Sequence, residues 1–330
     1  MYKAFFNLTR NPFELTPDPT CFVATRRHNE ALAALYYGVR WHKGFVVVTG
    51  EVGTGKTMLL RCLLNLLKDS QDIAYAYLFN SRLSTTEFLQ YILTDLGIPA
   101  SGRNKSEMLF DFGKYLIGRG ENNQTTVLVV DEAHSLSDDL LEEIRLLSNL
   151  ETTDTKLLQI VLVGQPELDT KLDSAHLRQL KQRVALRAQL RELDLHEAEE
   201  YITQRLQIAG APAENDPIFP AETVLAIHQH SKGLPRLINT ICENALIAAY
   251  AQQLRQVTPQ IVDKVAADFR LNVVHPAAAP STESITNGAR QPVETQRETD
   301  VLQDLFGITR KPASSNHHGP STVAAVASKL

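Results

Sequence analysis

Residues 50–57 read Gly-Glu-Val-Gly-Thr-Gly-Lys-Thr, and these residue types at this spacing suit the binding of a phosphate group. An apolar run precedes the segment and a helix-forming run follows it, so a strand would deliver the loop and a helix N-terminus would receive the anion. The glycines let backbone N–H groups curl around a β-phosphate without Cβ clashes. Lys56 can reach the β- and γ-phosphates, and the Thr57 hydroxyl can ligate Mg²⁺. An ordinary glycine-rich turn would need neither side chain. The residues expected to contact the nucleotide here are Gly50, Glu51, Val52, Gly53, Thr54, Gly55, Lys56, Thr57 and Met58.

A second apolar strand, 127–130, ends in two acids, Asp131 and Glu132. A carboxylate at the buried end of a strand can hold Mg²⁺ through its water shell, which is the role we assign to Asp131. Glu132 would then polarise the attacking water as a general base. Two acids at a strand end can also be a helix cap, but the phosphate loop earlier in the chain favours a catalytic pair. A second acid that activates water favours hydrolysis over transfer of a phosphoryl group to a substrate hydroxyl. His134 is expected to orient its neighbours, since the sequence lacks the partner motifs of a helicase.

Two further polar residues follow strands. Gln165 comes after strand 158–163. If that strand lies between those carrying the phosphate loop and Asp131, Gln165 lies near the γ-phosphate, where it can sense the nucleotide or position water. The alternative is a simple Gly-Gln-Pro turn. Asn80 ends an earlier strand and can hydrogen-bond Glu132, holding it inactive until a partner binds.

Four arginines precede residue 193: Arg178, Arg183, Arg187 and Arg191. A charge run usually forms a solvated face. A rigid arginine at a subunit edge can, however, reach the γ-phosphate of a neighbour, where it raises turnover by roughly 10³–10⁵-fold. Arg183, just before a strand, is the first choice for such a finger and Arg178 the second.

Arg236 lies at the start of a helix, after Gly233 has ended the preceding helix and with Pro235 in the first turn. A cation there is unfavourable with respect to the helix dipole. A bound γ-phosphate would compensate for it; the alternative is a surface arginine. The catalytic and nucleotide-sensing residues are therefore expected to be Lys56, Glu132, Gln165, Arg183, Arg236 and Asn80.

Short apolar strands alternate with helices between residues 26 and 192, a pattern that predicts an α/β domain with a parallel sheet covered on both faces. Ser84 and Glu87 form a capping box at the start of one helix. The predicted strands are 46–48, 73–79, 127–130, 158–163 and 184–190. The predicted helices are 26–41, 56–68, 84–96, 105–116 and 137–150.

The rest of the chain divides into three further parts. Residues 1–25 form an extended N-terminal arm, because the aromatic- and proline-rich segment does not suit a helix. Residues 193–271 form a small helical domain, with Asp194 as a helix N-cap. Residues 272–330 are expected to be disordered. Within this tail, residues 300–308 either dock as a short amphipathic turn on a partner or are a chance apolar cluster. The predicted helices of the small domain are 193–208, 220–230, 234–250 and 258–269.

Composition narrows the class of protein. The 330 residues carry a net charge of −5, so no global basic field draws nucleic acid, although a local patch remains open. Cys21, Cys62 and Cys242 lie far apart and indicate reduced thiols, and no His or Cys spacing predicts a zinc site. The N-terminus lacks a signal-peptide pattern and the longest apolar runs are of strand length, so we expect a soluble, cytoplasmic chain without a direct membrane span.

The motifs together resemble those of the AAA+ ATPases, and closely those of the ExeA/GspA-type secretion ATPases, from about residue 7 to 269. Besides the phosphate loop, the most specific are Asn11-Pro12-Phe13, Asp131-Glu132-Ala133-His134, Gly164-Gln165-Pro166 and Gly233-Leu234-Pro235-Arg236. The resemblance implies a P-loop NTPase three-layer sheet domain followed by an all-α lid. It also implies hydrolysis of ATP with Mg²⁺ at the subunit interfaces of a homo-oligomeric ring. In that family Gln165 falls at sensor 1, Arg236 at sensor 2 and Arg183 at the arginine finger.

One departure from the family bears on the biological role. ExeA-type proteins typically continue into a membrane span and a periplasmic peptidoglycan-binding domain, and neither is in this sequence. We therefore expect either a cytoplasmic protein that a membrane-bound partner recruits peripherally to the inner membrane, with residues 300–308 as the candidate docking segment, or a different role. The first hypothesis is an ATPase that drives assembly or regulation of a secretion or polysaccharide-export machine through protein partners. The others are a DNA-binding transposition ATPase of the TnsC/TniB type that recruits a transposase, and a non-enzymatic nucleotide-gated scaffold.

Overall fold

The computed structural model describes residues 2–16, 22–68, 70–79, 83–152, 155–211 and 217–271. Cys21, Asn80 and the tail 272–330, with its docking segment 300–308, lie outside the described residues. Among the helices that are described, none is long and apolar enough to cross a lipid bilayer.

Five parallel strands form one sheet in the order β2-β3-β4-β1-β5. Strands β1, β3 and β4 are buried along their whole length. Burial on both faces explains why their sequences are continuous apolar runs rather than alternating ones. The predicted parallel sheet is confirmed. The strands are β1 Phe45–Gly50, β2 Ile73–Leu78, β3 Thr125–Val130, β4 Leu158–Gly164 and β5 Val184–Leu190.

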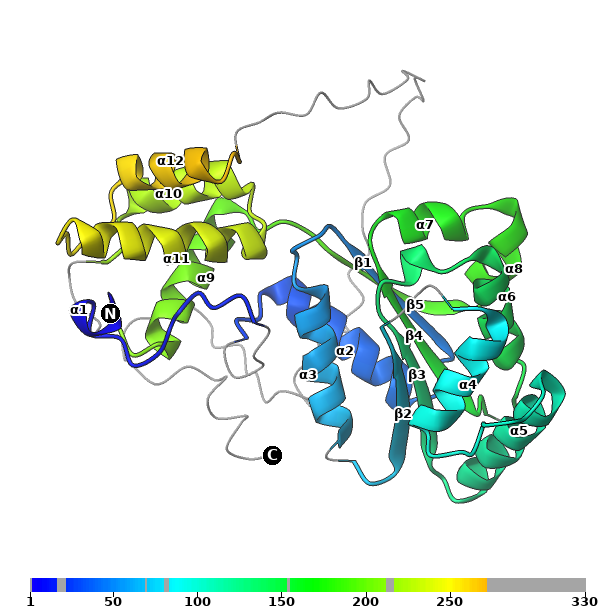
Figure 1. Ribbon diagram of the computed structural model, residues 1–330. Helices are drawn as coiled ribbons and strands as arrows, with labels where there is room; N and C mark the ends of the chain where they lie inside the picture. Colours follow the sequence, from blue (N-terminus) through cyan, green and yellow to red (C-terminus); the bar gives the residue numbers. More distant parts are fainter. Residues whose placement is uncertain are drawn as a thin grey trace, which may run out of the picture. The chain divides into compact units, whose positions relative to one another are not determined.

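Helices cover both faces of the sheet (Figure 1). On one face lie α2 (Arg26–Arg40) and α3 (Lys56–Lys68), and on the other lie α4 (Thr85–Asp95), α5 (Lys105–Glu121) and α6 (Asp138–Leu147). The predicted capping box of Ser84 and Glu87 is present at the start of α4. Each amphipathic helix packs its apolar face toward the sheet, and the helices form the two outer layers of a three-layer domain.

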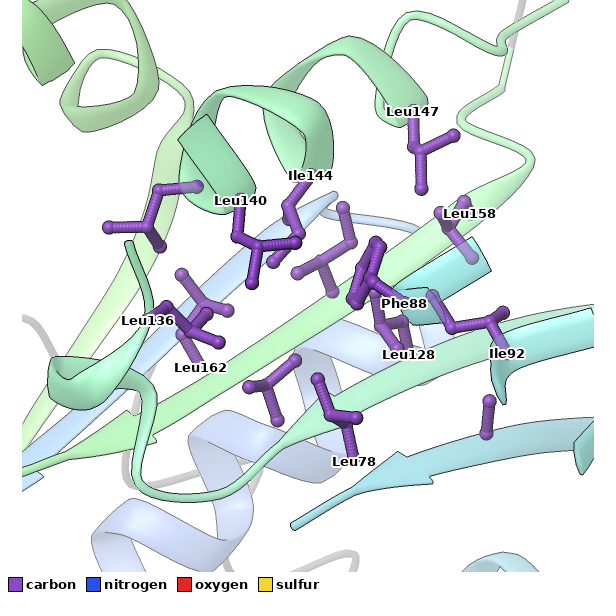
Figure 2. Close-up of a cluster of buried hydrophobic side chains, with 14 of the residues drawn as sticks. Leu78, Phe88, Ile92, Leu128, Leu136, Leu140, Ile144, Leu147, Leu158 and Leu162 are labelled. Carbon is purple, nitrogen blue, oxygen red and sulfur yellow. The ribbon is translucent and has the colours of Figure 1, made fainter. Parts of the chain in front are cut away.

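The main hydrophobic core lies between the sheet and the layer formed by α4, α5 and α6 (Figure 2). Its side chains interdigitate from strands and helices that are far apart in sequence, and this packing holds the strand ends in fixed register. The labelled side chains in Figure 2 are Leu78, Phe88, Ile92, Leu128, Leu136, Leu140, Ile144, Leu147, Leu158 and Leu162.

A second core belongs to the four helices that follow the sheet. These are α9 Leu195–Ile208, α10 Ala221–Ser231, α11 Pro235–Ala251 and α12 Pro259–Asp268. The four predicted helices are confirmed, including the N-cap at Asp194, whose side chain accepts a hydrogen bond from the backbone of Glu197. The division of the chain into domains near residue 193 stays a prediction.

The N-terminal segment packs into this second core, and it corrects one prediction. Residues Tyr2–Phe5 form a helix, α1, where an extended arm without a helix was predicted. The Tyr2 hydroxyl donates to both carboxylate oxygens of Glu243 on α11 at 2.8 Å, and Phe5 packs edge-to-face on Tyr250. These tertiary contacts override the weak local helix propensity of the segment.

Several boundaries also differ from the predicted ones. α5 continues past residue 116 through two glycines of low helix propensity, and in this last part Arg119 donates hydrogen bonds to the carbonyls of Asp72 and Thr125. α6 ends at Leu147 rather than at 150. Short helices that have too few turns to show a periodic pattern were not predicted: α7 Glu167–Leu172, α8 Arg178–Lys181 and the 3-10 helices Ala133–Ser135 and Ala175–Leu177.

Candidate nucleotide-binding site

The strand order decides which loops meet at the carboxyl edge of the sheet. β4 lies between β1 and β3, with Val163 beside Val48 and Leu162 beside Val130. Because all strands are parallel, the phosphate loop after β1, the two acids after β3 and Gln165 after β4 emerge at the same edge. The strand order that the prediction for Gln165 required is confirmed, and its chemical role stays a prediction.

The phosphate loop surrounds the ammonium group of Lys56. Gly53 and Gly55 have φ of 88° and 100°, the left-handed region where glycine is favoured. The Lys56 side chain is buried, and its Nζ donates to the carbonyls of Gly50 at 2.7 Å and Glu51 at 2.9 Å. Burial lowers its pKa, against the opposing effect of nearby carboxylates. A buried cation whose described hydrogen bonds both go to carbonyls suits an anionic ligand such as a phosphate.

His28, on α2, contacts the phosphate loop and was not predicted as a site residue from the sequence. Its Nε2 lies 2.9 Å from the carbonyl oxygen of Thr54, and its Nδ1 lies 2.8 Å from the hydroxyl of Thr25. The Thr25 hydroxyl oxygen accepts the His28 backbone N–H, so the neutral ring with its proton on Nε2 satisfies all three contacts. A Cβ at Gly55 would come within 2.9 Å of Nε2, so this glycine is required by close approach as well as by φ.

Asp131 is the buried acid next to the loop. Its Oδ2 accepts hydrogen bonds from the hydroxyls of Thr57 at 3.2 Å and Tyr77 at 3.1 Å, and its Oδ1 accepts the backbone N–H of Glu132 at 2.9 Å. Burial raises the pKa of Asp131, and the hydrogen bonds from the Glu132 backbone, Tyr77 and Thr57 only partly oppose this effect. Asp131 and Thr57 offer oxygen atoms side by side, the donor chemistry that Mg²⁺ prefers.

Glu132, His134 and Gln165 form a cluster at the same edge. The Glu132 backbone has φ of 53°, a left-handed conformation that a non-glycine residue rarely adopts. Its Oε2 lies 3.5 Å from Gln165 Nε2 and 3.4 Å from His134 Nδ1, while the Gln165 backbone N–H donates to the same Nδ1 at 3.3 Å. His134 therefore links the ends of β3 and β4, the orienting role expected from the sequence.

Glu132 and Gln165 line a cavity of about 390 Å³, within the range of ligand sites. Lys56, Glu132 and Gln165 provide polar lining, and Leu15 and Phe22 of the N-terminal segment provide apolar lining. A site with both kinds of wall suits a ligand that has a charged end and a flat apolar end. Among the described residues, the lining consists of Glu14, Leu15, Thr16, Phe22, Val23, His28, Val52, Gly53, Gly55, Lys56, Thr57, Met58, Glu132, Gln165, Tyr201, Arg205, Pro235, Arg236 and Asn239.

Arg236 lines this cavity from the first turn of α11. Its backbone N–H donates to the carbonyl of Gly53 at 3.2 Å, and a Cβ at Gly53 would lie 3.0 Å from the Arg236 Cβ. The start of α11 thus contacts the phosphate loop directly, and the exposed Arg236 side chain is free to turn toward an anion in the cavity.

Arg183 and Arg178 lie apart from the cavity lining. Arg183 Nη1 donates to Ser148 Oγ at 2.6 Å and to the Arg145 carbonyl at 3.5 Å. Arg178 is exposed on α8. Asn80 is not among the described residues. Within the described ranges, no group of three or more His, Cys, Asp or Glu residues could hold a metal by itself. The Mg²⁺ that Thr57 and Asp131 suit would therefore need phosphate oxygens or water to complete its coordination.

Comparisons with known proteins agree with this geometry. Residues 39–172, which include the phosphate loop, both acids and Gln165, match a family described as the AAA domain. Over 253 residues the chain is 43% identical to general secretion pathway protein A of Aeromonas hydrophila, an alignment that covers 76% of this chain. This chain is an AAA+ protein related to general secretion pathway protein A. The alignment covers 45% of that relative, so the chain spans about half its length.

Solved structures show the same fold at low sequence identity. The ORC2 protein of Aeropyrum pernix, in ADPNP and ADP complexes, superposes with a TM-score of 0.59 at 17% identity, covering 81% of this chain and 75% of that one. The origin recognition complex of Drosophila bound to DNA gives a TM-score of 0.58 at 22% identity, covering 81% and 66%. The predicted P-loop NTPase fold of the AAA+ type is confirmed.

Proposed function

We propose that the chain hydrolyses ATP with Mg²⁺. The observation that carries this proposal is that Lys56, Thr57, Glu132 and Gln165 line one cavity, and that the Thr57 hydroxyl donates to the buried Asp131. A phosphate loop alone would support binding only. The acids after β3 add what hydrolysis requires, a site for a divalent cation and a base for water.

Each residue has a defined part in this proposal. Lys56 holds the β- and γ-phosphates, and Thr57 with Asp131 holds Mg²⁺, which neutralises charge developing on the phosphates. Glu132 accepts the proton of the attacking water, and Gln165 orients that water or the γ-phosphate. Arg236 carries the state of the γ-phosphate to the helices after residue 193. Asn80 retains its proposed role as a restraint on Glu132.

We infer that subunits assemble into a ring in which Arg183, or in its place Arg178, reaches the γ-phosphate of a neighbour. The family resemblance of the chain supports this assembly. In the single chain Arg183 is bonded to Ser148 at the end of α6, so the side chain would have to leave that partner to act in a neighbouring site.

The partner is proposed to be a protein of a secretion or polysaccharide-export machine, located at the inner membrane, with this chain acting as a nucleotide-driven switch from the cytoplasmic side. The named relative, a general secretion pathway protein, supports this assignment. The transposition alternative requires DNA binding, and the net charge of −5 does not favour it. Salt-sensitive binding of duplex DNA that accelerates ATP turnover would favour that alternative, and turnover unaffected by DNA at low salt would favour the protein partner.

Substitution of Lys56 tests the nucleotide site. Lys56→Ala is expected to weaken ATP binding by roughly 10- to 100-fold, because it removes a charged donor to phosphate oxygens. Binding of a fluorescent ATP analogue and release of phosphate would be measured on the full chain. The matched control is Lys68→Ala, an exposed lysine at the other end of α3. Equal ATP affinity for the wild type and Lys56→Ala would overturn the proposed function.

A further inference from the structure

Tyr77 contacts the central acid of the site, yet the proposed mechanism gives it no part. It is the penultimate residue of β2, the edge strand of the sheet. Its neighbours Ala76 and Leu78 belong to the main core cluster, so strand alternation directs Tyr77 to the opposite face. On that face its hydroxyl lies 3.1 Å from Asp131 Oδ2.

The backbone of Tyr77 is fixed from the open side of the sheet. Its N–H donates to Asp95 Oδ2 at 2.7 Å, and its carbonyl accepts the Tyr91 hydroxyl at 3.2 Å. Asp95 and Tyr91 both belong to α4. An edge strand leaves such backbone groups unpaired, so these two bonds satisfy the edge and hold Tyr77 where its phenol reaches Asp131.

Two hydroxyls share Asp131 Oδ2, but they are not equivalent. Thr57 belongs to the phosphate loop and has a proposed part in holding Mg²⁺ itself. The phenol of Tyr77 has Asp131 as its partner and reaches no other part of the proposed chemistry in the described structure. Burial, followed by the charge of Asp131, raises the pKa of Tyr77, so the phenol keeps its proton and stays a donor.

We propose that Tyr77 is a positioning residue that fixes the carboxylate of Asp131 for the Mg²⁺ that accompanies the nucleotide. The inference rests on the proposed function. A donor on one carboxylate oxygen restricts the rotation of the group and so fixes the direction of both oxygens toward the cation. Loss of such outer-shell partners typically costs about 10- to 100-fold in metal affinity or activity.

The test separates metal dependence from nucleotide binding. A fluorescent ATP analogue is bound to the full chain while Mg²⁺ is titrated, and binding is measured separately in EDTA. Tyr77→Phe is expected to raise the half-saturating Mg²⁺ concentration by about tenfold, with affinity in EDTA within about twofold of the wild type. Tyr77→Leu should shift the Mg²⁺ dependence at least as far. In an Asp131→Ala background, Tyr77→Phe should add no further shift.

Tyr75→Phe is the matched control, because it removes a phenol hydroxyl two residues earlier on β2, and no described hydrogen bond links Tyr75 to Tyr77 or Asp131. It should leave the Mg²⁺ dependence of the wild type unchanged. If Tyr75→Phe shifts it as far as Tyr77→Phe does, or if Tyr77→Phe titrates like the wild type, the inference is overturned while the proposed function stands. If the wild type shows no Mg²⁺-dependent nucleotide binding, the proposed function itself fails.

Discussion

His28 is a buried, titratable side chain that contacts the phosphate loop, so its protonation affects the stability of the fold. The imidazole is 4% exposed and bonds the Thr54 carbonyl through Nε2 and the Thr25 hydroxyl through Nδ1. Burial lowers its pKa below the ordinary value of 6.5, an effect that the Thr54 carbonyl and the charge of Glu197 only partly oppose. Protonation would put a second proton on Nδ1, where the Thr25 hydroxyl now donates.

This arrangement predicts a loss of stability in acid. The unfolded chain takes up a proton on His28 before the folded chain does, so the free energy of unfolding falls as pH drops below 6.5. The slope from this one group is at most about 1.4 kcal/mol per pH unit. His28→Gln keeps an amide donor but cannot titrate, so its unfolding free energy should fall less between pH 6.5 and 5. Denaturant unfolding at each pH measures this.

The control for this comparison is His176→Gln, an exposed histidine in the 3-10 helix Ala175–Leu177. His42, whose pKa burial also lowers, is present in all three proteins and contributes the same background. Equal pH slopes for the wild type and His28→Gln would show that His28 does not titrate in this range.

At the scale of elements, the sequence predicted what depends on local pattern. The strands β1, β3 and β4 are unbroken apolar runs, and α4 and α9 carry capping residues, so their existence and type could be inferred. α1 could not be predicted, because its aromatic residues form a helix only when packed on α11. The short α7 and α8 have too few turns to show periodicity.

Within the site, too, residues marked by a local sequence pattern were predicted and residues that depend on tertiary contacts were not. Asp131, Glu132 and Gln165 were predictable because each follows an apolar strand, and parallel strands bring their carboxyl ends to one edge. His28 and Tyr77 were missed, since each acts through one contact to a residue distant in sequence, Thr54 for His28 and Asp131 for Tyr77. A tyrosine in an edge strand and a histidine in a helix carry no pattern that signals such contacts.

At the scale of the whole molecule, the proposed ring can be tested through Arg183. Arg183→Ala should lower the turnover of wild-type subunits when it is mixed with them in excess, because each wild-type site would then face a neighbour without a finger. A finger accounts for roughly 10³–10⁵-fold in turnover where it operates. Phosphate release would be measured across a series of mixing ratios, with Arg178→Ala as the alternative assignment.

Ser148→Ala is the matched control for this experiment. It removes the partner of Arg183 within the chain but leaves the arginine in place, so it should not lower the turnover of mixed subunits. If turnover simply follows the wild-type fraction in mixtures with Arg183→Ala, the arginine does not act between subunits.

In the proposed mechanism, hydrolysis depends on Glu132, the acid that follows Asp131. Glu132→Gln keeps the size of the side chain but cannot accept a proton from water, so phosphate release should fall by about 10²–10⁴-fold while ATP binding stays near the wild-type affinity. Glu167→Gln is the control, because Glu167 is an exposed acid whose charge also reaches Lys56. Binding and single-turnover phosphate release on the same preparations provide the most direct measurement. Slow release by Glu132→Gln alone is the predicted result, and release by Glu132→Gln at the wild-type rate would contradict the account.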